Sequence, residues 1–126
     1  MTNPVAVSKL EVKSHDSPDE TRTPSRTKIE VVKLEGFTIG RFNFEPGWRW
    51  SECIKPIVDT DSCQASHVGH AVAGRIAVRL ADGTEQTISA GQSYTIPPGQ
   101  DAWVEGSEPF VGIEVMGADQ YARPQN

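Results

Sequence analysis

Three stretches of the sequence concentrate the residue types that can do chemistry. Residues 45–53, 61–70 and 91–103 together hold all three tryptophans, both cysteines and two of the three histidines. Thiol and imidazole groups bind metal ions or transfer protons, and aromatic rings surround small organic ligands. Because these side chains lie on otherwise core-like segments, they indicate a lined cavity.

The two histidines of the middle stretch, His67 and His70, are three residues apart. In an extended strand such residues point to opposite faces, so they should not chelate one ion unless a bulge intervenes at Gly69. His67 is interpreted as a metal ligand or an acid–base catalyst, with a hydrogen-bonded core histidine as the alternative.

The two cysteines, Cys53 and Cys63, are the other strong candidates. Cys63 shares its strand phase with Asp61, and a thiolate favours zinc, copper(I) or iron over magnesium or calcium. The alternative for each cysteine is a small, inert core residue. A disulfide between them would need neighbouring strands and is disfavoured in a cytoplasmic setting.

Other catalytic signatures are absent from the sequence. It contains no Gly-x-Ser-x-Gly nucleophile elbow, no dinucleotide-binding fingerprint and no P-loop. Hydrolase, hydride-transfer and nucleotide-transfer functions therefore have no support.

The elements that position these residues are expected to be β-strands. Short runs rich in valine, isoleucine, threonine and aromatic residues alternate with glycine-containing turns, and no window has a long helical period. In residues 75–80, Ile76, Val78 and Leu80 form one face while Arg75 and Arg79 form the other. The pattern predicts an all-β sandwich or barrel of eight or nine strands. The expected strands are 29–34, 37–44, 49–54, 67–73, 75–80, 85–89, 93–96, 102–104 and 110–115.

Residues 1–28 differ from the rest of the chain. They contain no glycine and no aromatic residue, and nine of them are charged. We expect a flexible N-terminal arm here, or a strand formed by Val5, Val7 and residues 10–12 on the edge of a sheet of this chain or of a partner subunit. The expected organisation is the arm at 1–28, a β-barrel at 29–117 and a tail at 118–126.

Composition limits the partners. The 126 residues include 12 Lys and Arg against 17 Asp and Glu, a net charge of −5, which argues against nucleic-acid binding. No apolar run approaches the roughly 20 residues that span a membrane, and residues 1–20 lack the pattern of a secretory signal. We therefore expect a cytoplasmic protein without a membrane partner.

Several of these stretches resemble the motifs of the cupin family. Gly91-x5-Pro97-x-Gly99 matches the start of the second cupin motif, and residues 61–74, followed by a strand and Ala-Asp-Gly at 81–83, look like the first. Residues 37–117 are similar to a small bacterial single-domain cupin. Segments 46–56 (PGWRWSECIKP) and 96–103 (IPPGQDAW), with 60–63 (TDSC), resemble a narrower cupin subgroup.

The resemblance implies a cupin-type jelly-roll β-barrel, often a homodimer, with a divalent transition metal (Zn, Fe, Mn, Ni or Cu). By position, His67 replaces the family's glutamate, Asp61 and Cys63 replace two histidines, and Ala102 replaces the last histidine. Gln100 shares the strand phase of Ala102 and can stand in for it, and the subgroup has His at position 100 and His or Cys at position 53. The expected metal ligands are Cys53, Cys63, His67 and Gln100.

The remaining polar and aromatic residues of the three stretches are expected to line the ligand cavity. Tryptophans and tyrosine also commonly fill barrel cores, and Arg49 at the barrel mouth would pair with Glu52 or Asp101 or bind a carboxylate. The expected lining residues are Trp48, Arg49, Trp50, Asp61, His70, Tyr94 and Trp103.

Two functions follow from this interpretation. The first is a metal-dependent enzyme of oxygenase, isomerase or lyase type acting on a small molecule, with His67 as the acid–base catalyst if no metal is bound. The second is a metal-free module that binds or senses a small molecule without catalysis. The fold alone does not choose between them.

Overall fold

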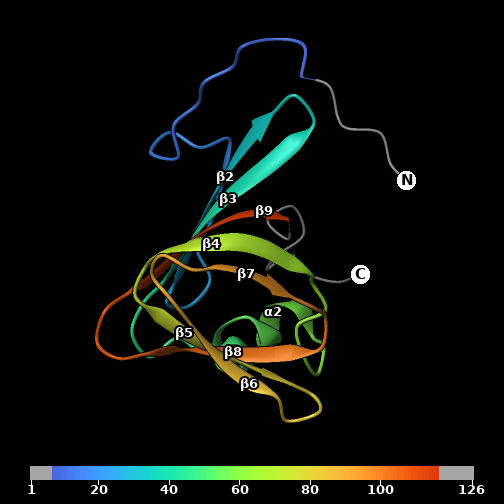
Figure 1. The fold of residues 1–126 in the computed structure, drawn as a ribbon, viewed down its shortest axis with the longest axis vertical. Helices are drawn as coiled ribbons and strands as arrows, with labels where there is room; N and C mark the ends of the chain where they lie inside the picture. The colour runs from blue at the N-terminus through green and yellow to red at the C-terminus, as the bar shows by residue number, and fades with distance from the viewer. Residues whose placement is uncertain (1–6, 117–126) are drawn as a thin grey trace.

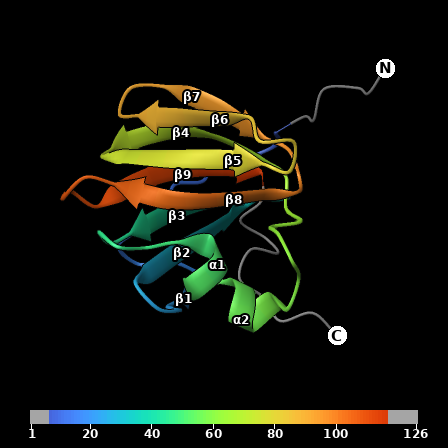
Figure 2. The same ribbon diagram turned by 90° about the horizontal axis from the view of Figure 1, so that it is seen from below.

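The polypeptide forms two antiparallel β-sheets that pack face to face, in a computed structural model that describes residues 7–116 (Figures 1 and 2). The larger sheet has the order β1-β2-β3-β9-β4-β7 and the smaller one β6-β5-β8. The strands are β1 (Glu20–Arg22), β2 (Thr27–Leu34), β3 (Phe37–Phe44), β4 (His67–Ala73), β5 (Arg75–Leu80), β6 (Glu85–Ser89), β7 (Ser93–Ile96), β8 (Gln100–Glu105) and β9 (Phe110–Met116). The predicted all-β architecture is confirmed.

The alternation of β5 is observed as predicted. Ile76 and Val78 are buried between the sheets, whereas Arg75 and Arg79 are exposed. β5 pairs with β6 on one side and β8 on the other, so it forms the centre of the smaller sheet.

The predicted strand at 49–54 is wrong. This segment forms two short helices, α1 (Trp50–Cys53) and α2 (Lys55–Val58), of which α1 contacts β8 (Figure 2). A helical turn buries Trp50 and Cys53 together, three positions apart, which a strand cannot do. The Asp101 carboxylate accepts a hydrogen bond from the Ser51 backbone N–H at 3.2 Å and pairs with Arg49 at 3.1 Å.

Residues 7–26 are attached along the β2–β3 hairpin, whose tip projects from the rest of the molecule (Figure 1). The only strand in this range is β1, and Val7 is exposed. The backbone N–H of Lys33 donates to Asp19 at 2.7 Å, and Arg41 pairs with Asp16 at 2.9 Å. The strand expected at Val5–Val12 is therefore not seen over residues 7–12, while Val5 and the tail at 118–126 lie outside the described residues.

An aromatic layer fills the space between the sheets. Phe44 of β3 stacks on Trp48 with ring centroids 3.9 Å apart and an interplanar angle of 7°. Phe42 meets Phe44 edge-on at 6.0 Å, and Phe110 of β9 adjoins Phe44 at 6.1 Å. Within residues 7–116 no helix is long and apolar enough to cross a membrane.

Replacing Trp48 by alanine is expected to lower the free energy of unfolding by about 3–5 kcal/mol, because it leaves a cavity beside Phe44. Urea denaturation measures the loss. Phe37→Ala is the matched control, since Phe37 is 41% exposed and its removal should cost about 1 kcal/mol or less. Equal losses for the two variants would contradict this account of the core.

Candidate functional site

A small, partly open cavity of about 30 Å³ lies between the sheets. It has room for one or two water-sized groups. Residues of β3, β4, β5, β7, β8, β9, α1 and the loops line it: Phe42, Phe44, Trp48, Trp50, Cys63, His67, Ile76, Tyr94, Ile96, Gln100, Ala102, Phe110 and Glu114. The aromatic layer thus encloses a small group of polar side chains.

Those polar side chains form one chain of contacts. His67 Nδ1 lies 2.6 Å from Glu114 Oε1, and the Tyr94 hydroxyl donates to Glu114 Oε2 at 2.8 Å. On the other side of the imidazole, His67 Nε2 lies 3.7 Å from Cys63 Sγ. The order Cys63–His67–Glu114 matches the arrangement of a nucleophile or base, an imidazole and an orienting carboxylate.

Cys63 is fixed by the edge of β8. Its backbone N–H donates to the carbonyl of Gln100 at 2.9 Å, and its carbonyl accepts from the Gly99 N–H at 2.6 Å. The Gln100 side-chain amide donates to the carbonyls of Ala65 and Pro97, both at 3.1 Å. The loop before β4, which carries Cys63, is therefore anchored to β8.

Two glycines make room for the Tyr94–Glu114 contact. A Cβ on Gly69 of β4 or on Gly112 of β9 would lie 2.8 Å from the Tyr94 hydroxyl oxygen. A side chain at either position would push the tyrosine away from the carboxylate.

The surroundings of His67 determine its charge. Burial alone lowers its pKa, but the negative charge of Glu114 and the hydrogen bonds to Cys63 and Glu114 outweigh burial and raise the pKa to about 10. Burial and Glu114 also raise the pKa of Tyr94 above its ordinary value. His67 is thus an imidazolium and Tyr94 a neutral donor at physiological pH.

Three buried polar atoms at this cavity have no hydrogen-bond partner within the described part of the chain. They are the indole Nε1 atoms of Trp48 and Trp50 and the Oε1 atom of Gln100. Buried donors and acceptors without partners are uncommon in native proteins, so these atoms indicate room for a polar occupant.

The structure brings six of the predicted site residues to the cavity: Trp48, Trp50, Cys63, His67, Tyr94 and Gln100. Cys53 packs in the core from α1 but is not among the lining residues. Asp61 is exposed on the loop before Cys63. Cys53 lies on a helical turn where a strand was expected, and Asp61 points to solvent and not to the predicted ligand cavity.

The other three predicted lining residues face outward. His70 is exposed on β4, where its Nδ1 lies 2.8 Å from the Ser93 hydroxyl oxygen. Arg49 pairs with Asp101, as one of the alternatives proposed, and its guanidinium lies 4.6 Å from the Trp103 ring centroid. Trp103 therefore packs on the outside of β8 and does not line the cavity.

The prediction did not include Glu114. It lies on β9, where Val111, Ile113 and Val115 alternate with Gly112 and Glu114. Val111, Ile113 and Val115 point outward, although they are the more apolar residues. The hydrophobic pattern therefore predicts the opposite face of β9 as the buried one. A carboxylate in the middle of an apolar strand was the one signal available.

The residues at the cavity do not fit a resident divalent metal. Within residues 7–116 no three His, Cys, Asp or Glu side chains come together as a metal site. Both carboxylate oxygens of Glu114 already contact His67 and Tyr94. The Ala102 side chain has no atom that can bind a metal, and Cys53 does not line the cavity. Cys63, His67 and the Gln100 amide remain, which is fewer strong donors than a divalent-metal site normally uses.

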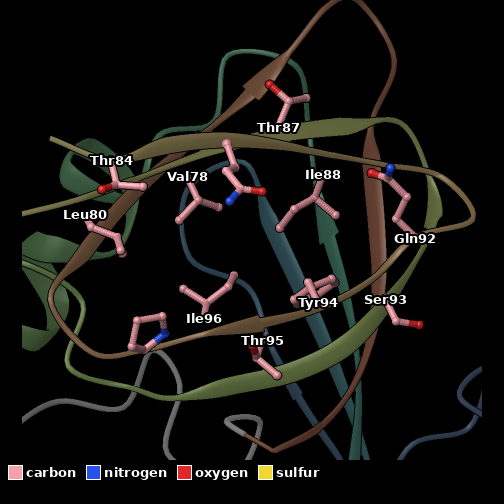
Figure 3. Close-up of a pocket in the computed structure, with 12 residues that line it drawn as sticks. Val78, Leu80, Thr84, Thr87, Ile88, Gln92, Ser93, Tyr94, Thr95 and Ile96 are labelled. Carbon is pink, nitrogen blue, oxygen red and sulfur yellow. The ribbon is translucent and has the colours of Figure 1, made fainter.

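A larger pocket of about 610 Å³, called the outer pocket, lies next to the 30 Å³ cavity, which is called the inner cavity. The outer pocket lies between the sheet edges formed by β6 and β7. Figure 3 shows Val78 and Ile88 facing Tyr94 and Ile96 across it. Tyr94 and Ile96 line both spaces, so they form the wall between them. The volume suits a small organic molecule.

Comparison with solved structures shows the fold. A protein of unknown function from Rhizobium leguminosarum matches with a TM-score of 0.63 and 20% identity over 94% of this chain and 100% of its own. A double-stranded β-helix domain protein from Klebsiella pneumoniae matches with a TM-score of 0.58 and 18% identity. The match covers 95% of this chain and 94% of the Klebsiella protein. A cupin-like protein from Thermotoga maritima matches with a TM-score of 0.51 and 14% identity. The match covers 73% of this chain and 68% of the Thermotoga protein.

No protein-family model matches the sequence, and no curated protein is significantly similar to it. The chain has the cupin-type double-stranded β-helix fold. The motif-based subgroup remains an expectation.

His67 is expected to remain protonated through pH 8 and to titrate near pH 10, because Glu114 stabilises the imidazolium. NMR of the imidazole carbons measures the midpoint. Since the folded pKa exceeds the unfolded value of about 6.5, the stabilisation is full below pH 6.5 and is lost as pH rises through 10. Glu114→Gln should lower the midpoint. A midpoint near 6.5 in both proteins would contradict the ion pair.

Proposed function

We propose that the protein binds a small uncharged organic molecule between its sheets and transfers a proton on it without a metal. Cys63 and His67 would be the reacting pair. The observation that supports this most is the contact of His67 with Cys63 at 3.7 Å on one ring nitrogen and Glu114 at 2.6 Å on the other.

The pair has the charges that proton transfer needs. In the proposed reaction Cys63 acts as the base, and the His67 imidazolium 3.7 Å away acts as the acid. The Cys63 thiolate would remove a proton from a carbon next to a carbonyl, while His67 Nε2 donates a proton to the carbonyl oxygen. Glu114 keeps the other ring nitrogen protonated and orients the ring. This is isomerase- or lyase-type chemistry.

The outer pocket supports the ligand class. Of the described residues that line it, none carries a formal charge, and its polar groups are hydroxyls and amides from residues such as Gln86, Thr87 and Thr95. A charged ligand would lose its hydration there without gaining a counter-charge. A hydroxy-carbonyl compound would use both the polar lining and the acid–base pair.

A second candidate is binding without reaction. The inner cavity measures only about 30 Å³, so a ligand in the outer pocket reaches Cys63 only if Tyr94 and Ile96 move aside. If they stay in place, the protein is a binding or sensing module.

Uncharged hydroxy-carbonyl compounds are expected to exchange their α-hydrogen for deuterium in D₂O with this protein. Dihydroxyacetone and glyceraldehyde are suitable probes, and ¹H NMR follows the exchange. Cys63→Ser and His67→Gln should each slow it about 100-fold or more, as for loss of a general acid or base.

Cys53→Ser is the matched control, because Cys53 is buried like Cys63 but does not line the cavity. Its exchange rate should be that of the unchanged protein. Probe binding without exchange would favour the second candidate, and neither binding nor exchange would overturn the proposed ligand class.

Protein purified without chelator is expected to contain well under one equivalent of transition metal, because the donor set is incomplete. Plasma mass spectrometry measures the content. One equivalent of metal that is lost in both Cys63→Ser and Gln100→Ala would instead indicate a site at Cys63, His67 and Gln100.

A further inference from the structure

We propose that Cys63 is a site of reversible oxidation, at which hydrogen peroxide converts the thiolate to a sulfenic acid. This goes beyond the proposed function. It uses the same Cys63–His67 pair but requires no organic ligand and no opening of the wall formed by Tyr94 and Ile96.

The first support is the position of the sulfur. Cysteines that react with peroxide are thiolates next to a cationic group. Cys63 Sγ has His67 Nε2 at 3.7 Å, and Glu114 holds the far side of that ring at 2.6 Å. The backbone contacts of Cys63 with Gly99 and Gln100 hold its main chain beside β8.

The second support is independent of the thiol. The cavity beside Cys63 has about 30 Å³, which suits a two-oxygen molecule and excludes bulky thiol reagents. Among the residues that line it, the N–H donors of Trp48 and Trp50 and the Oε1 acceptor of Gln100 have no partner within residues 7–116. Hydrogen peroxide both accepts and donates hydrogen bonds, so it can satisfy both kinds of group.

The reaction balances with the groups at hand. The Cys63 thiolate attacks one peroxide oxygen, the O–O bond breaks, and the S–O bond of the sulfenic acid forms. Sulfur loses two electrons and peroxide gains them. The departing hydroxide takes the proton of the His67 imidazolium and leaves as water. A thiol reductant later restores the cysteine.

Cys53 provides a control within the same molecule. Its exposed fraction is 6%, against 5% for Cys63, so burial does not distinguish the two. Cys53 does not line the cavity, and like Cys63 it is a buried cysteine outside any disulfide in the described range. Any difference in reactivity should therefore come from His67 and the cavity.

The test uses the full-length reduced protein with hydrogen peroxide and dimedone, in EDTA and without organic ligand. Peptide mass spectrometry counts dimedone adducts at each cysteine. Adducts at Cys63 should form at least about tenfold faster than at Cys53, because only Cys63 has a cationic partner. The bulky disulfide reagent DTNB should react slowly at both sites.

Two variants refine the result. Cys53→Ser should leave the rate at Cys63 unchanged, and Glu114→Gln should lower it, because the charge on His67 is then less favoured. Equal rates at Cys53 and Cys63, or faster reaction at Cys53, would overturn the proposal. Those outcomes would leave the deuterium-exchange test of the proposed function untouched.

Discussion

The carboxylate of Glu114 lies between three strands, with only 5% of the residue exposed. An unpaired charge in such a position is strongly unfavourable, so the fold must supply partners for both oxygens. His67 of β4 supplies one partner and Tyr94 of β7 the other. This shared carboxylate sets the orientation of the imidazole, and through it the charge beside Cys63. The features of the site that concern function depend on this pairing.

The sheet is adapted to that carboxylate at the expense of its own packing. Gly69 and Gly112 occupy inward positions where larger apolar residues would otherwise fill the core, and both leave space for the Tyr94 hydroxyl. The pairing of β4 with β9 shifts register between Val68 and Gly69, next to His67. A bulge at such a place re-aims side chains, which is a common use of bulges near functional sites. Glycine in a strand interior is otherwise unfavourable, so its presence twice around one hydroxyl indicates a requirement of the site.

The sequence pattern predicted most of the strands, but it did not predict every residue that the strands bring to the site. Alternation in residues 75–80 and glycine-rich turns predicted the sheets, because burial of one face determines such patterns. The pattern failed at 49–54, where Asp101, distant in sequence, binds the backbone of Ser51 and a helical turn forms. It also could not identify Glu114, since the outward residues of β9 are the more apolar ones. Both failures come from partners that meet only in the folded chain.

The chain carries different residues at the metal-binding positions of the motif that its sequence resembles. Where the family pattern has histidine or glutamate, this chain has Asp61 on an exposed loop, Cys63, His67 and Ala102. Of these, only Cys63 and His67 bring donor side chains to the cavity, and the carboxylate that accompanies them comes from β9 and contacts the ring nitrogen that faces away from the sulfur. A metal ligand set requires donors that converge on one point, whereas Cys63, His67 and Glu114 form a line. A line of base, imidazole and carboxylate is the geometry that acid–base sites use to move protons, and the proposed function rests on that geometry.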